Sequence, residues 1–371
     1  MNEDKSSRYH RLQRRASIAS FAWSAALLVA LASTSGSLHI RDAVTALTAS
    51  AALAIVLYVV ALTLLHEIGA FPLALYSDYF LEHRYGLSRQ ALREWLLDHA
   101  KGTAIGLGLV VGLASLLYWT MRVVPGWWWL ASGLFFAALL VTFVHLAPVL
   151  LLPVFFRFTP LDAPALRERL ERLAERAGAR VMGVFRWELG TKTSKANAAL
   201  AGSGRTRRIL IADTMLDHYS DDEIEVVLAH ELAHHVHRDI WTGIVYETVL
   251  TLAGFYTAHR VLAWLGPRAG LTSLSDPAGL PLLLLAVGGV SLMLMPAALA
   301  LSRSHERRAD RFALDLTRNP AAFASAMRRL GAQNLAEEHP SRAVQWLFYS
   351  HPPLADRLDA AARWPGVPVR E

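Results

Sequence analysis

Long stretches without Asp, Glu, Lys or Arg divide the chain into apolar and polar parts. Five of them reach about 20 residues, the length that an apolar helix needs to cross the hydrocarbon core of a bilayer. A sixth stretch, 240–265, is apolar but is interrupted by Glu247 and Arg260. The pattern therefore predicts six membrane-spanning helices. Five are the stretches without charge, 16–38, 43–65, 102–121, 123–156 and 277–302, and the other is 240–265.

The polar connections between these stretches alternate between many and few basic residues. The N-terminal arm has five, 66–102 has four, 157–239 has thirteen and the tail from 302 has eleven, whereas each intervening loop has one. Because cytoplasmic loops are enriched in Lys and Arg, both termini and both long polar segments are predicted to face the cytoplasm. A cleaved secretory signal is the alternative for the first stretch and leaves the other spans unchanged.

The two long polar segments, 157–239 and 302–371, are the parts that can form a water-exposed domain. A capping box at Ser220 predicts the start of a helix that runs through Arg238. Apolar periodicity predicts further helices over 163–177, 304–317 and 320–335, and strands over 181–187, 197–201 and 208–212, with a turn at 202–204 between the last two strands.

These elements predict a mostly α fold with two domains. Residues 1–156 form an N-terminal membrane domain with four spans. Residues 157–371 form a second domain, which contains a small cytoplasmic α+β part and two further spans at about 240–265 and 277–301. Glu247 lies inside the first of these two spans, where an ionisable side chain is expected either to line a water-filled chamber or to pair with another group.

Composition narrows the chemistry and the partners. The chain of 371 residues is 54% hydrophobic and 18% charged, and it has no cysteine, which excludes disulfides, thiolate zinc sites and iron–sulfur clusters. The net charge of +6 is spread over every cytoplasmic segment, so contact with anionic membrane lipids explains it and no nucleic-acid partner is expected. Only four of the 37 basic residues are lysine, which favours a bacterial source and an inner-membrane location.

A metal-binding pattern lies inside the Ser220 helix. His230 and His234 are separated by four positions, so both imidazoles share one helical face and can bind one metal ion. Glu231 is offset by one position and can activate a water molecule without being a ligand. A catalytic zinc needs a third protein ligand and an open position.

Without cysteine, the third ligand must be His, Asp or Glu. Glu306 is the best candidate and the neighbouring His305 is its rival, both just after the last span. Asp310 lies one turn beyond Glu306, where it can accept a hydrogen bond from a ligand imidazole. We expect one Zn²⁺ per chain.

Together these motifs resemble the M48 membrane metalloproteases, in particular the type I CAAX prenyl protease branch. The resemblance includes HExxH continued to Asp239, the SRxxExxADxFA pattern at 302–313 and the SHPPLxxRL pattern at 350–358. Residues 194–198 are similar to the family's SKxNA segment, and residues 209–216 (ILIADTML) are similar to its stretch of a strand followed by DTLL. Before the catalytic half, 82–90 and 98–102 look like the N-terminal membrane domain of that branch.

The resemblance implies a zincin-like α+β metalloprotease domain and the roles of individual residues. His230, His234 and Glu306 would bind zinc, with Glu231 as the base. Asn197 would help hold a peptide substrate as an added strand, and His351 and Arg357 would bind substrate and stabilise the oxyanion. The branch builds a large intramembrane chamber from seven spans, whereas the charge pattern here predicts six.

The expected reaction is zinc-dependent hydrolysis of a peptide bond in a peptide or protein substrate, with prenylation left open. The alternative within proteases is a membrane quality-control peptidase like the heat-shock M48 members, which would cut misfolded membrane proteins. A non-catalytic scaffold with a relict metal site is disfavoured by the complete set of ligands. A transporter would leave the metal motifs unexplained.

Overall fold

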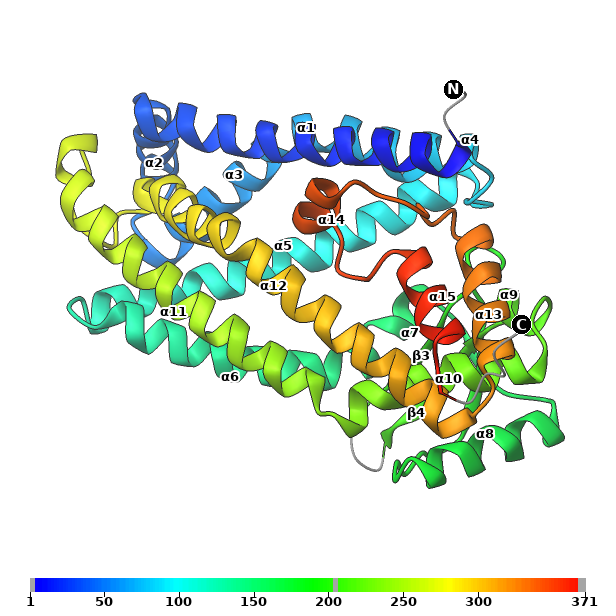
Figure 1. Ribbon diagram of the computed structural model, residues 1–371. Coiled ribbons are helices and arrows are strands. Elements are labelled where there is room, and N and C mark those ends of the chain that lie inside the picture. The colour runs from blue at the N-terminus through cyan, green and yellow to red at the C-terminus, as the bar shows by residue number, and fades with distance from the viewer. Residues whose placement is uncertain (1–3, 203–205, 366–371) are drawn as a thin grey trace.

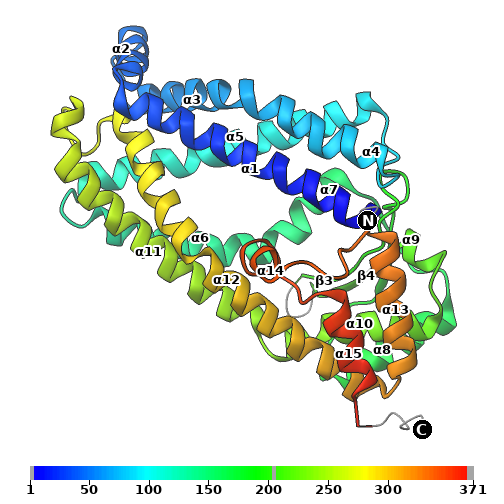
Figure 2. The same ribbon diagram turned by 45° about the horizontal axis from the view of Figure 1, so that its top comes forward.

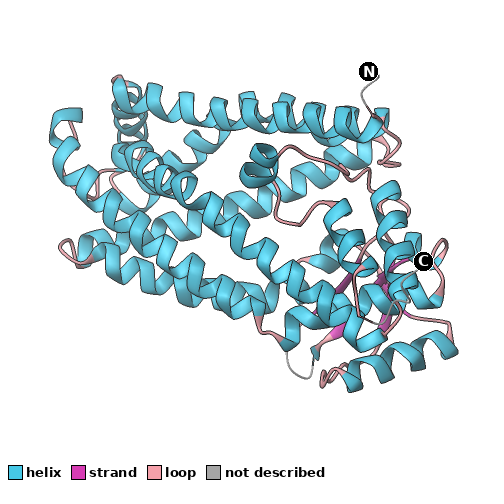
Figure 3. Cartoon of the chain, in the orientation of Figure 1, coloured by secondary structure: helices cyan, strands magenta, loops and turns pink. Residues whose placement is uncertain are grey.

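The computed structural model describes residues 4–202 and 206–365 and consists mainly of helices (Figures 1 and 3). Long helices occupy most of the length of the molecule, and a small sheet with short helices lies at one end (Figure 1). The long helices are α1 (Lys5–Ser33), α3 (Ala51–Ala74), α5 (Leu92–Val123), α6 (Trp128–Leu150), α11 (Asp239–Leu265) and α12 (Leu280–Thr317).

Five helices in the described residues are long and apolar enough to cross a membrane. They confirm five of the six predicted spans and are Lys5–Ser33, Ala51–Arg84, Leu92–Val123, Trp128–Phe155 and Pro277–Thr317. The sixth, α11, forms a helix of 27 residues but is not among these five. Its apolar sequence is broken by Asp239, Glu247 and Arg260, and it lies alongside α6 and α12 (Figure 1).

Shorter elements connect the long helices. α2 (Gly36–Leu47) joins α1 to α3, and a π-helical segment (Leu75–Leu81) followed by α4 (Glu82–Arg84) continues α3. α12 is longer than the sequence predicts, because the expected span 277–301 and the expected helix 304–317 form one continuous helix. That helix runs from the membrane bundle into the sheet-containing end, which places Glu306 on a rigid extension of a span (Figure 2).

A four-stranded sheet with strand order β1-β2-β4-β3 lies at the other end. Its strands are β1 (Phe158–Pro160), β2 (Val184–Trp187), β3 (Ala198–Ala201) and β4 (Arg208–Ala212). β2 and β4 are parallel, whereas the other two pairs are antiparallel. The sequence missed β1, whose three residues are too few for an alternating pattern to be visible. The predicted turn at 202–204 extends outside the described residues.

Helices cover the sheet and form its core. They are α7 (Leu152–Phe155), α8 (Pro164–Arg176), α9 (Asp213–Leu216), α10 (Asp221–Val236), α13 (Pro320–Gln333) and α15 (Leu354–Ala362), whereas α14 (Arg342–Phe348) lies apart from the sheet, next to α12. Leu170, Ile209 and Leu228 are fully buried where α8, β4 and α10 meet. β3 is one of the two edge strands, so one side of its backbone is not paired within the sheet.

A buried carboxylate fixes the loop between α11 and α12, at the end of the bundle remote from the sheet. Asp276 has a side chain that is 1% exposed and accepts a charge-assisted hydrogen bond from Arg41 of α2 at 2.8 Å. It also accepts hydrogen bonds at 3.0 Å from Thr272, through both the backbone and the hydroxyl, and from the backbone of Ala278. The loop is therefore tied to the short helix α2.

We predict that Asp276→Ala lowers the thermal stability of the protein in detergent. The substitution leaves buried N–H donors without an acceptor, a loss on the order of 1–3 kcal/mol. Asp42→Ala is the matched control, because Asp42 also contacts Arg41 but its side chain is 63% exposed. Equal melting temperatures for the two variants would contradict the role given to Asp276.

Candidate metal centre

The helix α10 presents the HExxH residues from a firmly defined start. The Ser220 hydroxyl accepts a hydrogen bond from the Glu223 backbone, and the Glu223 carboxylate accepts one from the Ser220 backbone, at 3.3 and 2.8 Å. This reciprocal pair is the capping box that the sequence predicts. Glu223 also accepts hydrogen bonds from Ser325 and Arg329 of α13, which fix α10 against its neighbour.

Two imidazoles of α10 meet one carboxylate of α12. His230 Nε2 lies 3.2 Å from Glu306 Oε2, and His234 Nε2 lies 3.3 Å from Glu306 Oε1. One ligand atom from each residue lies within 4.8 Å of the others. His230 and Glu306 are buried, at 7% and 6% exposure. The structure thus brings together the three residues that the sequence predicts as ligands.

The cluster fits a tetrahedral zinc ion. Bonds of about 2.0–2.2 Å to nitrogen and oxygen place adjacent tetrahedral ligands about 3.3 Å apart, close to the two separations observed here. Glu306 Oε2 is buried and, apart from the 3.2 Å contact with His230 Nε2, has no polar partner in the described structure. A buried carboxylate oxygen without a donor is costly unless a cation neutralises it, so the donor set suits a bound metal ion.

Each ligand imidazole is held from behind by a second carboxylate. His230 Nδ1 lies 2.9 Å from Asp310 Oδ1, as expected from the sequence, and His234 Nδ1 lies 2.9 Å from Asp239 Oδ2. Such contacts fix the ring orientation and leave Nε2 to the metal. Asp239 was noted in the sequence only as part of the motif. It reaches His234 because Arg238, with φ of 57°, ends α10 in the left-handed region and turns the chain back.

Arg357 lies behind the ligands. Its guanidinium donates two hydrogen bonds to Asp310, at 2.9 and 2.6 Å, and its side chain is 15% exposed. Its Nη2 is 3.4 Å from His230 Nδ1. This geometry positions Asp310 and, through it, His230. The contact with substrate that the resemblance implies for Arg357 stays a prediction.

His305, the rival ligand, points elsewhere. Its Nε2 lies 3.2 Å from the Thr242 hydroxyl of α11, whereas its neighbour Glu306 faces the two imidazoles. Consecutive residues on a helix are about 100° apart, so only one of them can face α10. In the structure, this residue is Glu306.

Glu231 and His351 flank the cluster. Burial raises the pKa of Glu231, while the nearby His230 and His234 act in the opposite direction. No hydrogen-bond partner of the Glu231 side chain is found in the described part of the chain. His351 lies between α14 and α15, with its Nε2 3.6 Å from Glu306 Oε1 and its side chain 60% exposed. Both side chains are therefore available for contact with a bound substrate.

Asn197 precedes the free edge strand and is exposed. The pairing of β3 with β4 directs the backbone groups of Ala199 towards β4, so those of Ala198 and Leu200 face the open edge.

The chain leading into β3 is held on both sides. The Asn334 side chain bonds both the N–H and the C=O of Ala196, at 3.0 and 3.1 Å, and the Ser194 N–H donates to Leu87 at 3.0 Å.

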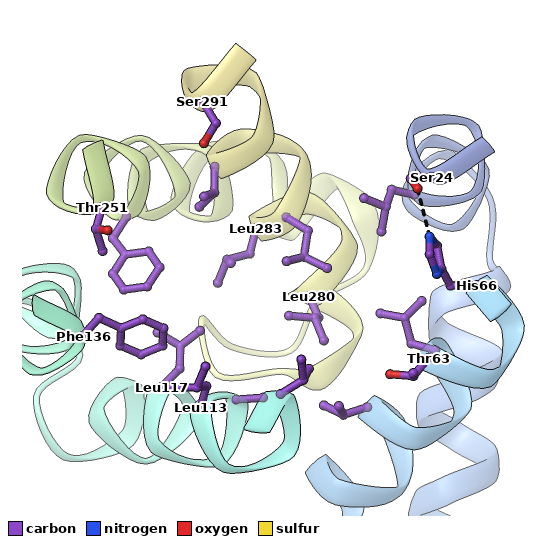
Figure 4. Close-up of a pocket in the computed structure, with 18 of the residues that line it drawn as sticks. Ser24, Thr63, His66, Leu113, Leu117, Phe136, Thr251, Leu280, Leu283 and Ser291 are labelled. Atoms are coloured by element: carbon purple, nitrogen blue, oxygen red, sulfur yellow. Dashed lines mark hydrogen bonds between the residues drawn. The ribbon is translucent and has the colours of Figure 1, made fainter. Parts of the chain in front are cut away.

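A separate cavity lies inside the membrane bundle (Figure 4). It has a volume of about 760 Å³ and is lined mostly by apolar side chains of α1, α3, α5, α6, α11 and α12, including Phe136 and Leu283. Among its polar members are Glu247 and the hydrogen-bonded pair Ser24 and His66, 2.9 Å apart. Glu247 thus lines a cavity within the membrane bundle, and the water-filled chamber considered for it stays a prediction.

Two family models together match nearly the whole chain. Residues 160–365 match the model of Peptidase family M48, and residues 2–157 match the model described as CAAX prenyl protease N-terminal, five membrane helices. Within the described part of that N-terminal region, four helices are long and apolar enough to span, since α2 has only 12 residues.

Relatives and a solved structure agree with these matches. The CAAX prenyl protease 1 homolog of Oryza sativa is 30% identical over 79% of this chain and 70% of its own length. The uncharacterized metalloprotease YhfN of Bacillus subtilis is 27% identical over 85% of this chain and 74% of its own length. The fold is similar to that of the S. mikatae Ste24p crystal structure, with a TM-score of 0.87, 22% identity and coverage of 96% of this chain and 88% of the other. The chain therefore belongs to peptidase family M48 and is an integral-membrane metalloprotease that resembles the CAAX prenyl proteases.

Proposed function

We propose that the protein is a zinc endopeptidase of the HExxH type, with one Zn²⁺ bound by His230, His234 and Glu306. The observation that carries this proposal is the three-residue cluster, in which each imidazole has a carboxylate behind it and the buried Glu306 carboxylate faces both imidazoles. When bound, zinc would polarise the scissile carbonyl and make an attacking water more acidic.

Glu231 is the general base in this proposal. Its raised pKa and lack of a committed partner suit a carboxylate that accepts a proton from the attacking water and passes it to the leaving nitrogen. His351, in the segment between α14 and α15, faces the cluster. It donates a hydrogen bond to the carbonyl oxygen of the substrate as negative charge develops there. Donors in this position commonly contribute a hundredfold or more in rate.

The substrate backbone would add to the edge of β3. Ala198 and Leu200 offer unpaired N–H and C=O groups, and the exposed amide of Asn197 can bond the same backbone. Recognition through main-chain groups leaves side-chain selectivity loose. The clamp on Ala196 and Ser194 supports this role, because it fixes where the edge strand begins.

We propose a prenylated or otherwise lipid-linked protein as substrate, at the cytoplasmic face of a bacterial inner membrane. The match of residues 2–157 to the CAAX prenyl protease N-terminal model supports this substrate class over misfolded membrane proteins. The distribution of basic residues supports a cytoplasmic position for both termini and for the metal centre. Anionic lipids would contact the basic segments on that side.

Glu231→Gln is expected to retain about one zinc per chain and to lose peptidase activity by 10²–10⁴-fold, because the general base is removed and the ligands are kept. Zinc content and peptide hydrolysis are the measurements. Glu225→Gln is the matched control on the same helix, since Glu225 pairs with Arg169 outside the centre. Full activity of Glu231→Gln would reject the assignment.

Asp239→Asn is expected to weaken zinc binding by about 10–100-fold, because the His234 ring loses the carboxylate that orients it. Competition with a chromophoric chelator measures the affinity directly. The exposed Asp217→Asn serves as the control. An Asp239→Asn variant with the zinc affinity of the parent protein would show that this contact does not support the site.

The substrate class is tested by two peptides of identical sequence, one farnesylated on a cysteine four residues from the C-terminus and one unmodified. We expect the farnesylated peptide to be cleaved with the higher kcat/KM, with Glu231→Gln as the inactive control. Equal cleavage of both peptides, together with cleavage of an unfolded membrane protein, would favour the quality-control alternative.

A further inference from the structure

The segment that carries His351 is fixed through one residue, Tyr349. This residue follows α14 directly and lies two positions before His351. Its two polar ends are bound by different parts of the molecule. The hydroxyl donates to Glu337 at 2.5 Å and accepts from Arg14 at 3.2 Å, whereas the backbone carbonyl accepts from Arg303 at 2.7 Å.

The hydroxyl end is held by the first membrane helix. Arg14 of α1 forms an ion pair with Glu337 at 2.6 Å, and the two side chains are only 19% and 10% exposed. His10, one turn earlier on α1, contacts the carbonyl of Leu335 at 2.8 Å, and its ring lies beside that of Tyr349 in a tilted arrangement, with centroids 6.1 Å apart. Burial and the hydrogen bond to Glu337 raise the pKa of Tyr349, so the phenol stays protonated as a donor.

The carbonyl end is held by the helix that carries Glu306. Arg303 lies one turn before Glu306 on α12, is 6% exposed, and donates to the carbonyls of Tyr349 and Gln345, the second at 3.1 Å. None of the proposed catalytic steps uses Arg303. Its contact explains what this arginine of the SRxxE pattern does: it ties the His351 segment to the same helix as the third metal ligand.

We infer that Tyr349 is a positioning residue for His351, and that Arg14 of the N-terminal membrane helix and Arg303 of α12 together set the place of this imidazole at the metal centre. The inference rests on the proposed role of His351. α14 and the segment after it lie between α1 and α12 in both views of the chain (Figures 1 and 2). A shift of α1 relative to α12 would therefore move His351, whose Nε2 is now 3.6 Å from Glu306.

The side chain of His351 has few other restraints. It is 60% exposed, and its one hydrogen bond in the described structure joins Nδ1 and the hydroxyl of the adjacent Ser350, at 2.8 Å. Ser350 moves with the same segment, so this contact cannot hold the imidazole against the rest of the protein. The fixed points nearest to His351 on its N-terminal side are those of Tyr349.

Tyr349→Phe tests the inference with the loss of one hydroxyl group. We expect kcat to fall about 3–10-fold, because the rate falls steeply when the His351 imidazole is displaced from its productive position. KM is expected to change by less than about twofold. Zinc content is expected to stay at that of the parent.

Arg14→Gln should behave in the same way as Tyr349→Phe. Arg14→Lys should retain most of kcat, because a single Arg14 nitrogen makes both contacts. Arg15→Gln is the matched control, because Arg15 is exposed and forms no ion pair with any described residue.

The decisive measurement is a double-mutant cycle with His351→Ala, measured with whichever of the two peptides above is cleaved better. If Tyr349 acts through His351, Tyr349→Phe lowers kcat by less than about 1.5-fold in the His351→Ala background. The same 3–10-fold loss in both backgrounds would overturn the inference, as would a loss of zinc or of melting temperature that parallels the loss of rate.

The proposed function is judged separately in the same experiment. An active Glu231→Gln variant would contradict the zinc-peptidase mechanism itself, whatever Tyr349→Phe does. An inactive Glu231→Gln with additive losses at Tyr349 and His351 would reject the positioning role alone. A His351→Ala variant with the kcat of the parent would remove the role of His351 and, with it, the inference.

Discussion

One carboxylate of α12 meets two imidazoles of α10, and this contact joins the membrane bundle to the sheet-containing part of the molecule. Glu306 lies on a helix of 38 residues that begins in the membrane bundle, and His230 and His234 lie on a capped helix beside the sheet. Because α12 is continuous, the position of the bundle fixes the position of the third ligand. Binding of the proposed zinc ion would therefore couple the membrane part of the chain to its peptidase part.

The surrounding groups hold this contact in place. Asp310 and Asp239 orient the two rings, Arg357 fixes Asp310, and Arg303 ties the His351 segment to α12. Buried charges of this kind are costly unless they are paired. Here carboxylates outnumber cations among the groups nearest to the two imidazoles, an imbalance that a divalent cation would relieve. The charge arrangement and the ligand geometry thus favour the same chemistry.

Much of this centre could be predicted from the sequence, because a helical repeat fixes which residues share a face. The spacing of His230, Glu231 and His234 is a local property, and so is the choice of Glu306 just after an apolar span. Asp239 was harder to place, since its contact with His234 depends on the left-handed residue Arg238 and not on helical periodicity. The contacts of Arg14 and Arg303 with Tyr349 join residues far apart in the chain, which no local pattern reveals. The sixth predicted span, α11, is long enough to cross a membrane but is not among the five apolar spanning helices of the described residues, and Glu247 and Arg260 lie within it.

We propose that His230, His234 and Glu306 bind one zinc ion. Anomalous diffraction from crystals of the purified protein, recorded on both sides of the zinc absorption edge, tests it most directly. We expect a single strong zinc peak about 2.0–2.2 Å from His230 Nε2, His234 Nε2 and a Glu306 carboxylate oxygen. A zinc peak bound by His305 in place of Glu306, or no peak between α10 and α12 in zinc-loaded protein, would contradict it.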